Sequence, residues 1–200
     1  MQAEGCDAIY RSFMEKKLVT LDSASTIADG ISVKVPGDKT VEIINKYVDG
    51  VVTVSDTEIA DAILLLMERC KQIVEPSGAT PVAAVLNGKI DVKGKKAVCV
   101  LSGGNIDVSF VQSIIEQGLF ARHRRVRFSV TLLDRPGSLV KLLEIIASSG
   151  ANVLTIEHDK LREGLKPNET TVHIACETGG KDHAERLLKA ITDNGYKMEI

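Results

Sequence analysis

The sequence predicts an α/β protein in two parts: a partial, open and mostly parallel sheet, followed by a ferredoxin-like βαββαβ unit. Helical and strand-like patterns alternate between residues 38 and 119, as in βαβ units that form a parallel sheet. Near Arg125 the pattern changes, because apolar and polar residues begin to alternate one by one. Aromatic residues make up only 4% of the chain, so the core is aliphatic, as is usual for buried parallel strands.

The first helices and strands follow from apolar spacing. Residues 38–48 have the spacing of a helix, and the β-branched run 51–54 is predicted to be a short strand. Ser55 and Glu58 stand at the spacing of a capping box, in which each side chain satisfies a free backbone N–H at a helix start. We expect the helix that follows to continue to about Lys71.

Proline and apolar runs organise the next stretch. Pro76 is predicted to end the preceding helix, and a shorter helix is predicted over residues 80–86. Residues 97–101 are all apolar, so they are predicted to form a strand that is covered on both faces. Cys70 and Cys99 fall inside such patterns and are interpreted as small buried hydrophobic residues.

The second part contains alternating strands and two amphipathic helices in the order βαββαβ, which is the ferredoxin-like arrangement. A turn at residues 134–138 joins the first strand to the first helix, with Pro136 expected in the first helical turn. The predicted strands are residues 126–132, 151–158, 170–176 and 196–200, and the predicted helices are residues 139–146 and 184–191.

Bulk properties exclude several classes of protein. The net charge of −2 and the isoelectric point near 6.1 argue against binding to nucleic acid. The apolar runs are too short for a membrane span and no signal-peptide pattern is present, so a cytoplasmic protein without membrane contact is expected. The basic run 122–125 is interpreted as a linker between a first domain at residues 1–121 and a second at 126–200.

Two loops have the composition of ligand-binding loops. Ser102, Gly103 and Gly104 follow the predicted strand at the position where open α/β sheets bind ligands, and the glycines would allow close approach. The alternative is a tight turn in which Ser102 caps the next helix, and spacing leaves both interpretations open. Glu75, which precedes Pro76, could face a ligand or cap the next helix, and the cap is the favoured interpretation.

Three segments together resemble a known family. Ala28-Asp29-Gly30, Glu75-Pro76-Ser77-Gly78-Ala79 and Leu101-Ser102-Gly103-Gly104-Asn105-Ile106-Asp107 occur in the order and spacing of the serine/threonine dehydratases. These are fold-type II pyridoxal-phosphate enzymes. The resemblance implies that residues 1–121 are the carboxy-terminal part of a catalytic domain. It also implies that the complete protein is a threonine ammonia-lyase, which converts threonine to 2-oxobutanoate and ammonia in amino-acid metabolism such as isoleucine biosynthesis.

The resemblance also implies roles for five residues around pyridoxal 5′-phosphate. Ser102 would be the hydroxyl partner of the pyridine nitrogen, and Gly103 and Gly104 would allow the ring to approach closely. Gly30 and Glu75 would line the ring and the substrate. A neutral hydroxyl at the ring nitrogen leaves it largely unprotonated, which suits β-elimination.

The family's reaction needs a lysine that forms the internal Schiff base, in a Ser-Phe-Lys pattern, and a glycine-rich phosphate loop. No lysine follows Ser-Phe in this chain, and no run of three glycines occurs. We therefore expect the chain to begin midway through the catalytic domain and to be inactive alone, so no catalytic residue is assigned. Glu4 resembles a metal-ligand position of some relatives, but the residues after it fit poorly and no metal is expected.

Residues 126–200 resemble an ACT domain, a small module that binds amino acids. The loop from Leu133 to Leu139 matches the ligand loop of these domains, where backbone N–H groups at a helix start receive the effector carboxylate. Asp134 would cap the helix or take the effector ammonium group. A paired domain would complete the site, so a homo-oligomer is expected. The effector-binding residues are expected to be Asp134, Arg135, Pro136, Gly137 and Ser138, with Asn152, Val153 and Leu154 from the paired domain.

Two functions of different classes stay open. One is an enzyme part, which should regain activity when an amino-terminal fragment carrying the lysine is supplied. The other is a non-catalytic amino-acid-binding regulator that keeps part of an old catalytic domain for dimerisation. Within the first, a serine dehydratase or serine racemase is the nearest alternative to the threonine enzyme.

Overall fold

The computed structural model describes residues 1–199, and it divides the chain into two compact units, Met1–Ile115 and Glu116–Ile200. The division falls inside helix α5 (Val108–Ala121), which ends just before the expected linker at residues 122–125. The expected domain limits therefore stay a prediction. Within residues 1–199, no helix is both long enough and apolar enough to cross a membrane.

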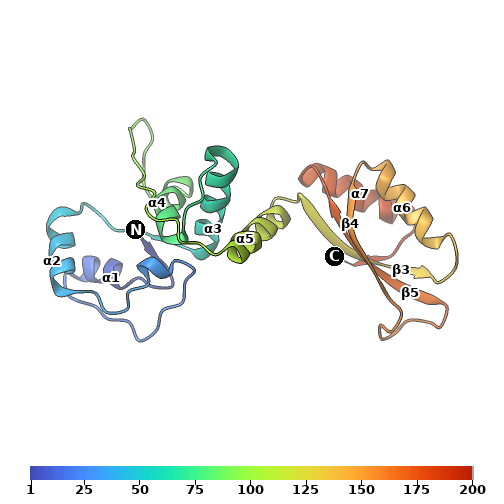
Figure 1. Cartoon of the computed structure of the whole chain (residues 1–200), viewed down its shortest axis with the longest axis horizontal. Helices are drawn as coiled ribbons and strands as arrows, with labels where there is room; N and C mark the ends of the chain where they lie inside the picture. The colour runs from blue at the N-terminus through green and yellow to red at the C-terminus, as the bar shows by residue number, and fades with distance from the viewer. Residues whose placement is uncertain (200) are drawn as a thin grey trace. The chain divides into compact units, whose positions relative to one another are not determined.

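The first unit is mostly helical around one short parallel strand pair (Figure 1). Strand β1 pairs in parallel with β2, which confirms a parallel arrangement but limits it to two residues in each strand. A 3-10 turn at Asp29–Ile31 and a π-helical turn at Leu66–Cys70 complete the unit. Its other elements, besides α5, are β1 (Gln2–Ala3), α1 (Ala8–Glu15), α2 (Asp38–Tyr47), β2 (Thr53–Val54), α3 (Asp56–Leu65) and α4 (Pro76–Leu86).

Helix α3 begins with the predicted capping box. The hydroxyl of Ser55 accepts the N–H of Glu58 at 3.2 Å, and the carboxylate of Glu58 accepts the N–H of Ser55 at 2.8 Å. Behind this cap, Ile59 and Ile63 are fully buried in the core of the unit. Two donors that a helix start usually leaves unpaired are thus satisfied by side chains.

Helix α4 begins earlier than predicted. Pro76 is its first residue, where a missing N–H costs nothing because first-turn donors have no helical partner. The residues from Pro76 to Thr80 are buried, so the glycine and small side chains of this turn pack against neighbouring segments. The prediction that this helix starts near Thr80 was therefore wrong by about one turn.

Residues 97–101 do not form the predicted strand. The stretch has no regular structure, and its side chains are exposed: Val98 is 90% exposed and Val100 is 70% exposed. A buried strand needs a hydrogen-bonded neighbour and covering layers, and among residues 1–199 neither lies beside this stretch. The expected burial of Cys70 and Cys99 is not found either. Cys70, the last residue of the π-helical turn, is exposed, and Cys99 is only partly buried.

The second unit confirms the βαββαβ order, although Ile200, the last residue of the predicted final strand, lies outside the described residues. Its four strands form one antiparallel sheet with the order β4-β5-β3-β6, and Figure 1 shows α6 and α7 together on one face of it. The elements are β3 (Arg125–Leu133), α6 (Ser138–Ser148), β4 (Asn152–Asp159), β5 (Glu169–Glu177), α7 (Lys181–Asp193) and β6 (Met198–Glu199).

Alternation along β3 separates the two faces of this sheet. Phe128 and Val130 are buried among Leu142 and Leu187 of the two helices. Ser129, which lies between them, faces away from the helices, as the period of two requires. The fold thus places the turn between β3 and α6 at one end of the sheet, where the first residues of a helix are free to contact a ligand.

Candidate ligand-binding sites

Glu75 directly precedes α4 but does not cap it. Its side chain makes no capping hydrogen bond, and its Oε2 instead accepts the backbone N–H of Asn105 at 3.2 Å. Its own N–H donates to the carbonyl of Gly103 at 3.5 Å. The favoured interpretation of Glu75 as a helix cap was therefore wrong, because the carboxylate turns toward the Ser102–Asn105 loop.

Gly103 must be glycine in this arrangement. Its φ of +78° lies in the left-handed region, and a β-carbon added there would lie 2.3 Å from the carboxyl carbon of Glu75. Gly104 has no such constraint, because the nearest atom to an added β-carbon is the carbonyl oxygen of Ile73 at 3.8 Å. The two predicted glycines are thus unequal, and only Gly103 permits the close contact with Glu75.

Gly30 also lies beside Glu75. A β-carbon on Gly30 would lie 2.7 Å from the hydroxyl oxygen of Ser77 and 3.3 Å from Oε1 of Glu75. The Ser77 hydroxyl is buried and has no hydrogen-bond partner among the described residues. Leaving such a group unpaired costs about 1–3 kcal/mol, so an unpaired buried hydroxyl calls for a functional role or a further partner. Sequence reasoning missed Ser77, although it lies inside one of the quoted segments.

Ser102 is exposed and does not cap α5. Asp107 has that role, since its Oδ1 accepts the N–H of Ser109 at 2.7 Å. Hydrogen bonds from the hydroxyl and N–H of Ser109, aided by the N–H of Phe110, hold the pKa of Asp107 below its ordinary value. The alternative in which Ser102 is merely a helix cap was therefore wrong. A hollow of about 240 Å³ borders the same loop, lined in part by Asp29, Pro76 and Asn105.

The first unit therefore brings four of the five predicted cofactor residues, Gly30, Glu75, Ser102 and Gly103, to adjoining segments. They present a fixed carboxylate, an exposed neutral hydroxyl and a glycine that allows close approach, together with the unpaired hydroxyl of Ser77. Such a set fits the polar edge of a flat heteroaromatic ring better than it fits a metal ion, which would need several convergent oxygen or nitrogen ligands.

The turn at residues 134–138 lies at the start of α6. Asp134 does not cap this helix; its Oδ2 pairs with Nζ of Lys160 at 2.7 Å. Gly137 occupies the cap position with a φ of +87°, a conformation that glycine adopts without strain. Pro136 was expected in the first turn of this helix. It lies instead in the turn before α6, so that prediction was wrong. Of the two predicted roles of Asp134, the helix cap is wrong, and binding of an ammonium group stays a prediction.

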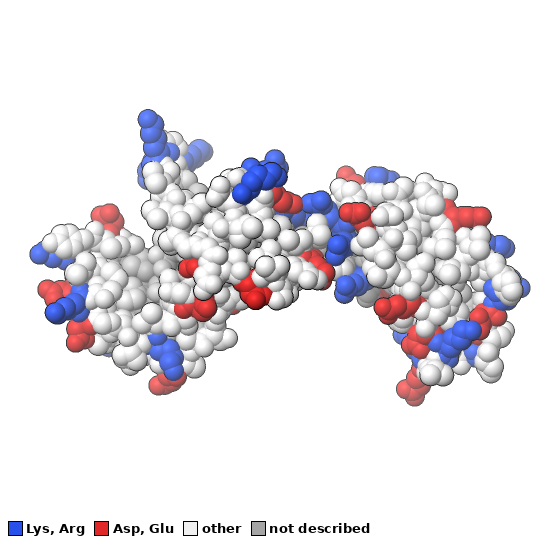
Figure 2. All heavy atoms as spheres, viewed as in Figure 1, with Lys and Arg blue, Asp and Glu red and all other residues white. Residues whose placement is uncertain are grey.

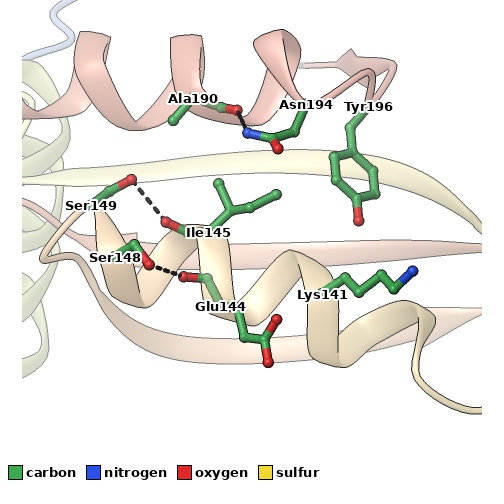
Figure 3. Close-up of a pocket in the computed structure, with 8 residues that line it drawn as sticks. All are labelled: Lys141, Glu144, Ile145, Ser148, Ser149, Ala190, Asn194 and Tyr196. Atoms are coloured by element: carbon green, nitrogen blue, oxygen red, sulfur yellow. Dashed lines mark hydrogen bonds between the residues drawn. The ribbon is translucent and has the colours of Figure 1, made fainter.

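Two hollows lie along α6, and the smaller one adjoins this turn. One of about 250 Å³ is lined by residues that include Arg135, Ser138, Lys141 and Tyr196. A larger groove of about 720 Å³ between α6 and α7 shares Lys141 and Tyr196 with it, and Figure 3 shows both side chains at the end of the groove nearest the start of α6. Lys141 was detectable from the sequence, because it lies one helical turn after Ser138. No pattern marked Tyr196.

A single chain does not join the two halves of the predicted effector site. Asn152 pairs with Glu177 at one end of the sheet, whereas Leu133, just before the turn, pairs with Glu169 at the opposite end. Asn152, Val153 and Leu154 are thus remote from the 134–138 turn of the same copy. If these two groups bind one ligand, a second copy must supply one of them.

Comparison with known proteins agrees with the geometry of the first unit. The model of the family described as pyridoxal-phosphate dependent enzyme matches residues 1–103, which include Glu75, Ser102 and Gly103. The chain belongs to this family of pyridoxal-phosphate-dependent enzymes. The match ends within the Ser102–Asn105 loop.

Individual proteins that resemble the chain include two curated enzymes and one solved structure. The chain is 42% identical over 200 residues to an L-threonine ammonia-lyase of Thermotoga maritima and 40% identical over 200 residues to one of Geobacter sulfurreducens; each match covers 100% of this chain and 50% of the relative. Among solved structures, maize serine racemase is similar with a TM-score of 0.52 and 35% identity, over 59% of this chain and 37% of that one. The chain spans about half the length of the curated relatives that it matches along its whole length.

Proposed function

We propose that this chain is the carboxy-terminal part of a pyridoxal-phosphate-dependent L-threonine ammonia-lyase, which in its complete form converts threonine to 2-oxobutanoate and ammonia. The observation that carries the proposal is the position of Glu75, whose carboxylate is held by the N–H of Asn105 beside Gly103 and leaves its helix uncapped. The names of the Thermotoga and Geobacter relatives supply the substrate.

The cofactor, when bound, supplies the electron sink that lets the substrate lose its α-proton and expel its β-hydroxyl. In this proposal the hydroxyl of Ser102 would hydrogen-bond the ring nitrogen, and its neutrality would keep a full positive charge off that nitrogen. Gly103 lets the backbone come close to the ring. Glu75, fixed by Asn105, orients the polar edge of the bound ligand and excludes water there.

The chain alone is proposed to be inactive, because it lacks the anchoring lysine. The test is to mix it with the amino-terminal half of the Thermotoga maritima relative, the part that the chain does not match, and to assay 2-oxobutanoate formation from threonine. Turnover in the mixture, absent from either part, supports the proposal. If every such fragment binds but none yields turnover, the non-catalytic regulator becomes the better interpretation.

A serine racemase or serine dehydratase is a second candidate, favoured by the similarity to maize serine racemase. The same mixture distinguishes them when serine is supplied in place of threonine. A threonine ammonia-lyase should deaminate threonine with the higher kcat/KM, whereas a racemase should form D-serine faster than pyruvate. Chiral chromatography measures D-serine, and an assay for 2-oxo acids measures pyruvate and 2-oxobutanoate.

We further propose that the second unit is an ACT-type regulatory domain that binds an amino acid effector at residues 134–138. Three features support this role: the ferredoxin-like fold, the carboxylate of Asp134, which does not cap α6, and the hollow beside the turn. Because Asn152 lies at the other end of the sheet, the complete site requires a homo-oligomer. Calorimetric titration with isoleucine, valine and threonine, together with light scattering, tests both parts; a monomer that still binds would contradict the shared site.

A further inference from the structure

The sheet of the second unit has a hollow on the face that α6 and α7 do not cover. Figure 1 shows both helices on the other face, and Figure 2 shows charged side chains of both signs interspersed on the side away from them. The hollow has a volume of about 450 Å³. It shares no lining residue with the two hollows along α6, so it is separate from the 134–138 turn.

The register of the sheet brings one polar side chain from each of the four strands into a single row beside this hollow. Glu157 of β4 pairs with His173 of β5, which pairs with Ser129 of β3, and Ser129 also pairs with Glu199 of β6. Side chains of directly paired residues project from the same face and can interact. Nδ1 of His173 lies 2.7 Å from the hydroxyl oxygen of Ser129. All four residues line the hollow.

The next row on the same face has a small residue at its centre. Ala175 of β5 pairs with Arg127 of β3 on one side and with Thr155 of β4 on the other. Its side chain is a single methyl group, whereas the side chain of Arg127 is long. The middle of the row is therefore low, and all three residues line the hollow.

Two of the charged groups around the hollow are not compensated by a charge of opposite sign. Glu199 is paired with Arg162 at 2.6 Å. The carboxylate of Glu157 forms no hydrogen bond or ion pair with another residue among residues 1–199, and the guanidinium of Arg127 forms none with a carboxylate there. Arg127 lies instead 4.6 Å from the centre of the Phe120 ring. One negative and one positive charge thus remain, on strands that are separated only by β5.

We propose that this hollow binds a zwitterionic α-amino acid with a hydroxyl side chain, at a second site that is independent of residues 134–138. Neighbouring strands lie about 4.8 Å apart, so the backbones of β3 and β4 are about 10 Å apart, and the side chains of Arg127 and Glu157 can reach one small ligand above Ala175. The guanidinium of Arg127 binds the ligand carboxylate, a pairing that its planar fork of N–H donors favours. The carboxylate of Glu157 accepts from the ligand ammonium group.

The hydroxyl group of the ligand is assigned to the polar row. A serine hydroxyl has one donor and two acceptor positions, and its contact with His173 uses one of them. Ser129 therefore keeps hydrogen-bonding capacity for a ligand hydroxyl, which an aliphatic side chain would leave unused. The site goes beyond the proposed function and does not depend on catalysis.

The experiment is a titration of the whole, 15N-labelled chain with L-threonine, followed by NMR, which also detects weak binding. Threonine should shift the amide signals of Arg127, Ser129, Glu157 and His173 in a saturable way. Three matched ligands each remove one group: N-acetyl-L-threonine lacks the positive charge, L-threoninamide lacks the negative charge, and L-valine has a similar shape without the hydroxyl. All three should bind more weakly at these signals than threonine does.

Two variants test the charged groups. Glu157→Gln and Arg127→Gln should each weaken the binding of threonine about tenfold, which corresponds to about 1.4 kcal/mol. The matched controls are Glu185→Gln and Arg186→Gln, since both residues are exposed on α7, which packs on the other face of the sheet. The controls should bind threonine as the wild type does. Circular dichroism melts check that all four variants are folded.

Several results would overturn the proposal. They are the absence of saturable shifts in the polar row, equal affinity of the wild type and both charge variants, or equal affinity for threonine and its two charge-blocked derivatives. Shifts in this row that follow dilution of the protein without any amino acid would assign the face to a contact between two copies instead.

Asp134→Asn separates this site from the proposed effector turn. It should leave the threonine shifts at Ser129 and Glu157 unchanged, and their loss in this variant would show that a single site causes them and would contradict a second one. The titration needs no turnover, so a failure to form 2-oxobutanoate contradicts the proposed activity and leaves this result as it stands.

Discussion

The carboxyl carbon of Glu75 lies only 2.3 Å from the position that a β-carbon on Gly103 would take. The two residues come from separate segments, the residue before α4 and the loop before α5, and a hydrogen bond from Asn105 holds the carboxylate in place. This contact explains why a glycine is needed at position 103 and why Glu75 does not serve its own helix. Both segments therefore depend on each other for their conformation.

Gly103→Ala should destabilise the first unit more than Gly104→Ala does. The left-handed φ of +78° costs alanine about 1–2 kcal/mol, and the new methyl group would also displace the carboxylate of Glu75. A β-carbon on Gly104 would meet only the carbonyl oxygen of Ile73, at an ordinary contact distance of 3.8 Å, so its alanine variant is the control. Urea unfolding of both variants measures the difference, and equal stability of the two would contradict the Glu75 contact.

The capping box predicts a loss of stability at low pH. Partial burial raises the pKa of Glu58, but hydrogen bonds from Ser55 and the ion pair with Lys89 outweigh it, so the pKa lies below its ordinary value of 4.5. The stabilisation is therefore present above pH 4.5 and is lost as the pH falls through the lowered pKa of the folded protein. Glu58→Gln should flatten this part of the stability profile.

The control for this profile is Glu42→Gln, which changes an exposed carboxylate on α2. Urea unfolding at several pH values between about 6 and 3 compares the free energy of unfolding of the two variants and the wild type. This range brackets the ordinary pKa values of carboxylates. Ser55→Ala should also lower the stability by about 1 kcal/mol at neutral pH. A Glu58→Gln profile that follows the wild type would show that the capping box contributes nothing to acid sensitivity.

The cysteines should differ widely in reactivity. Burial raises the pKa of the Cys176 thiol to about 11, so almost no thiolate exists near neutral pH, whereas Cys70 is exposed. A chromogenic disulfide reagent at pH 7.5 should modify Cys70 within the fast phase and Cys176 only after denaturation. Cys70→Ser should remove the fast phase, and a Cys176 signal in the native protein would contradict the packing of β5.

Asp134 and Lys160 should affect effector binding in opposite directions. Lys160 pairs with the carboxylate of Asp134 at 2.7 Å, so it competes with the ammonium group of a bound amino acid. Asp134→Asn should weaken binding by about tenfold, since a hydrogen bond to a charged group contributes about 1.5–3 kcal/mol. Lys160→Met should tighten binding. Calorimetry with isoleucine and valine tests this, and unchanged affinity in both variants would move the site elsewhere.

Local sequence patterns determined most of the second unit and parts of the first. The alternation along residues 126–132 places Phe128 and Val130 toward α6 and α7, and the spacing of Ser55 and Glu58 produces the observed cap. Such features depend on the period of a strand or on contacts within one helical turn, so the sequence alone is enough to predict them. The segments that resemble the dehydratases likewise mark Glu75 and Gly103 as candidate cofactor residues.

Tertiary structure alone decided which of these residues meet and which apolar runs are covered. Glu75 could cap a helix or face a ligand, and only the position of Asn105 and Gly103 excluded the cap. Residues 97–101 have the composition of a buried strand but lie exposed, because burial depends on neighbouring strands that a local pattern does not specify. The composition of a segment indicates whether it can form a strand, but only the tertiary structure shows whether neighbouring strands cover it.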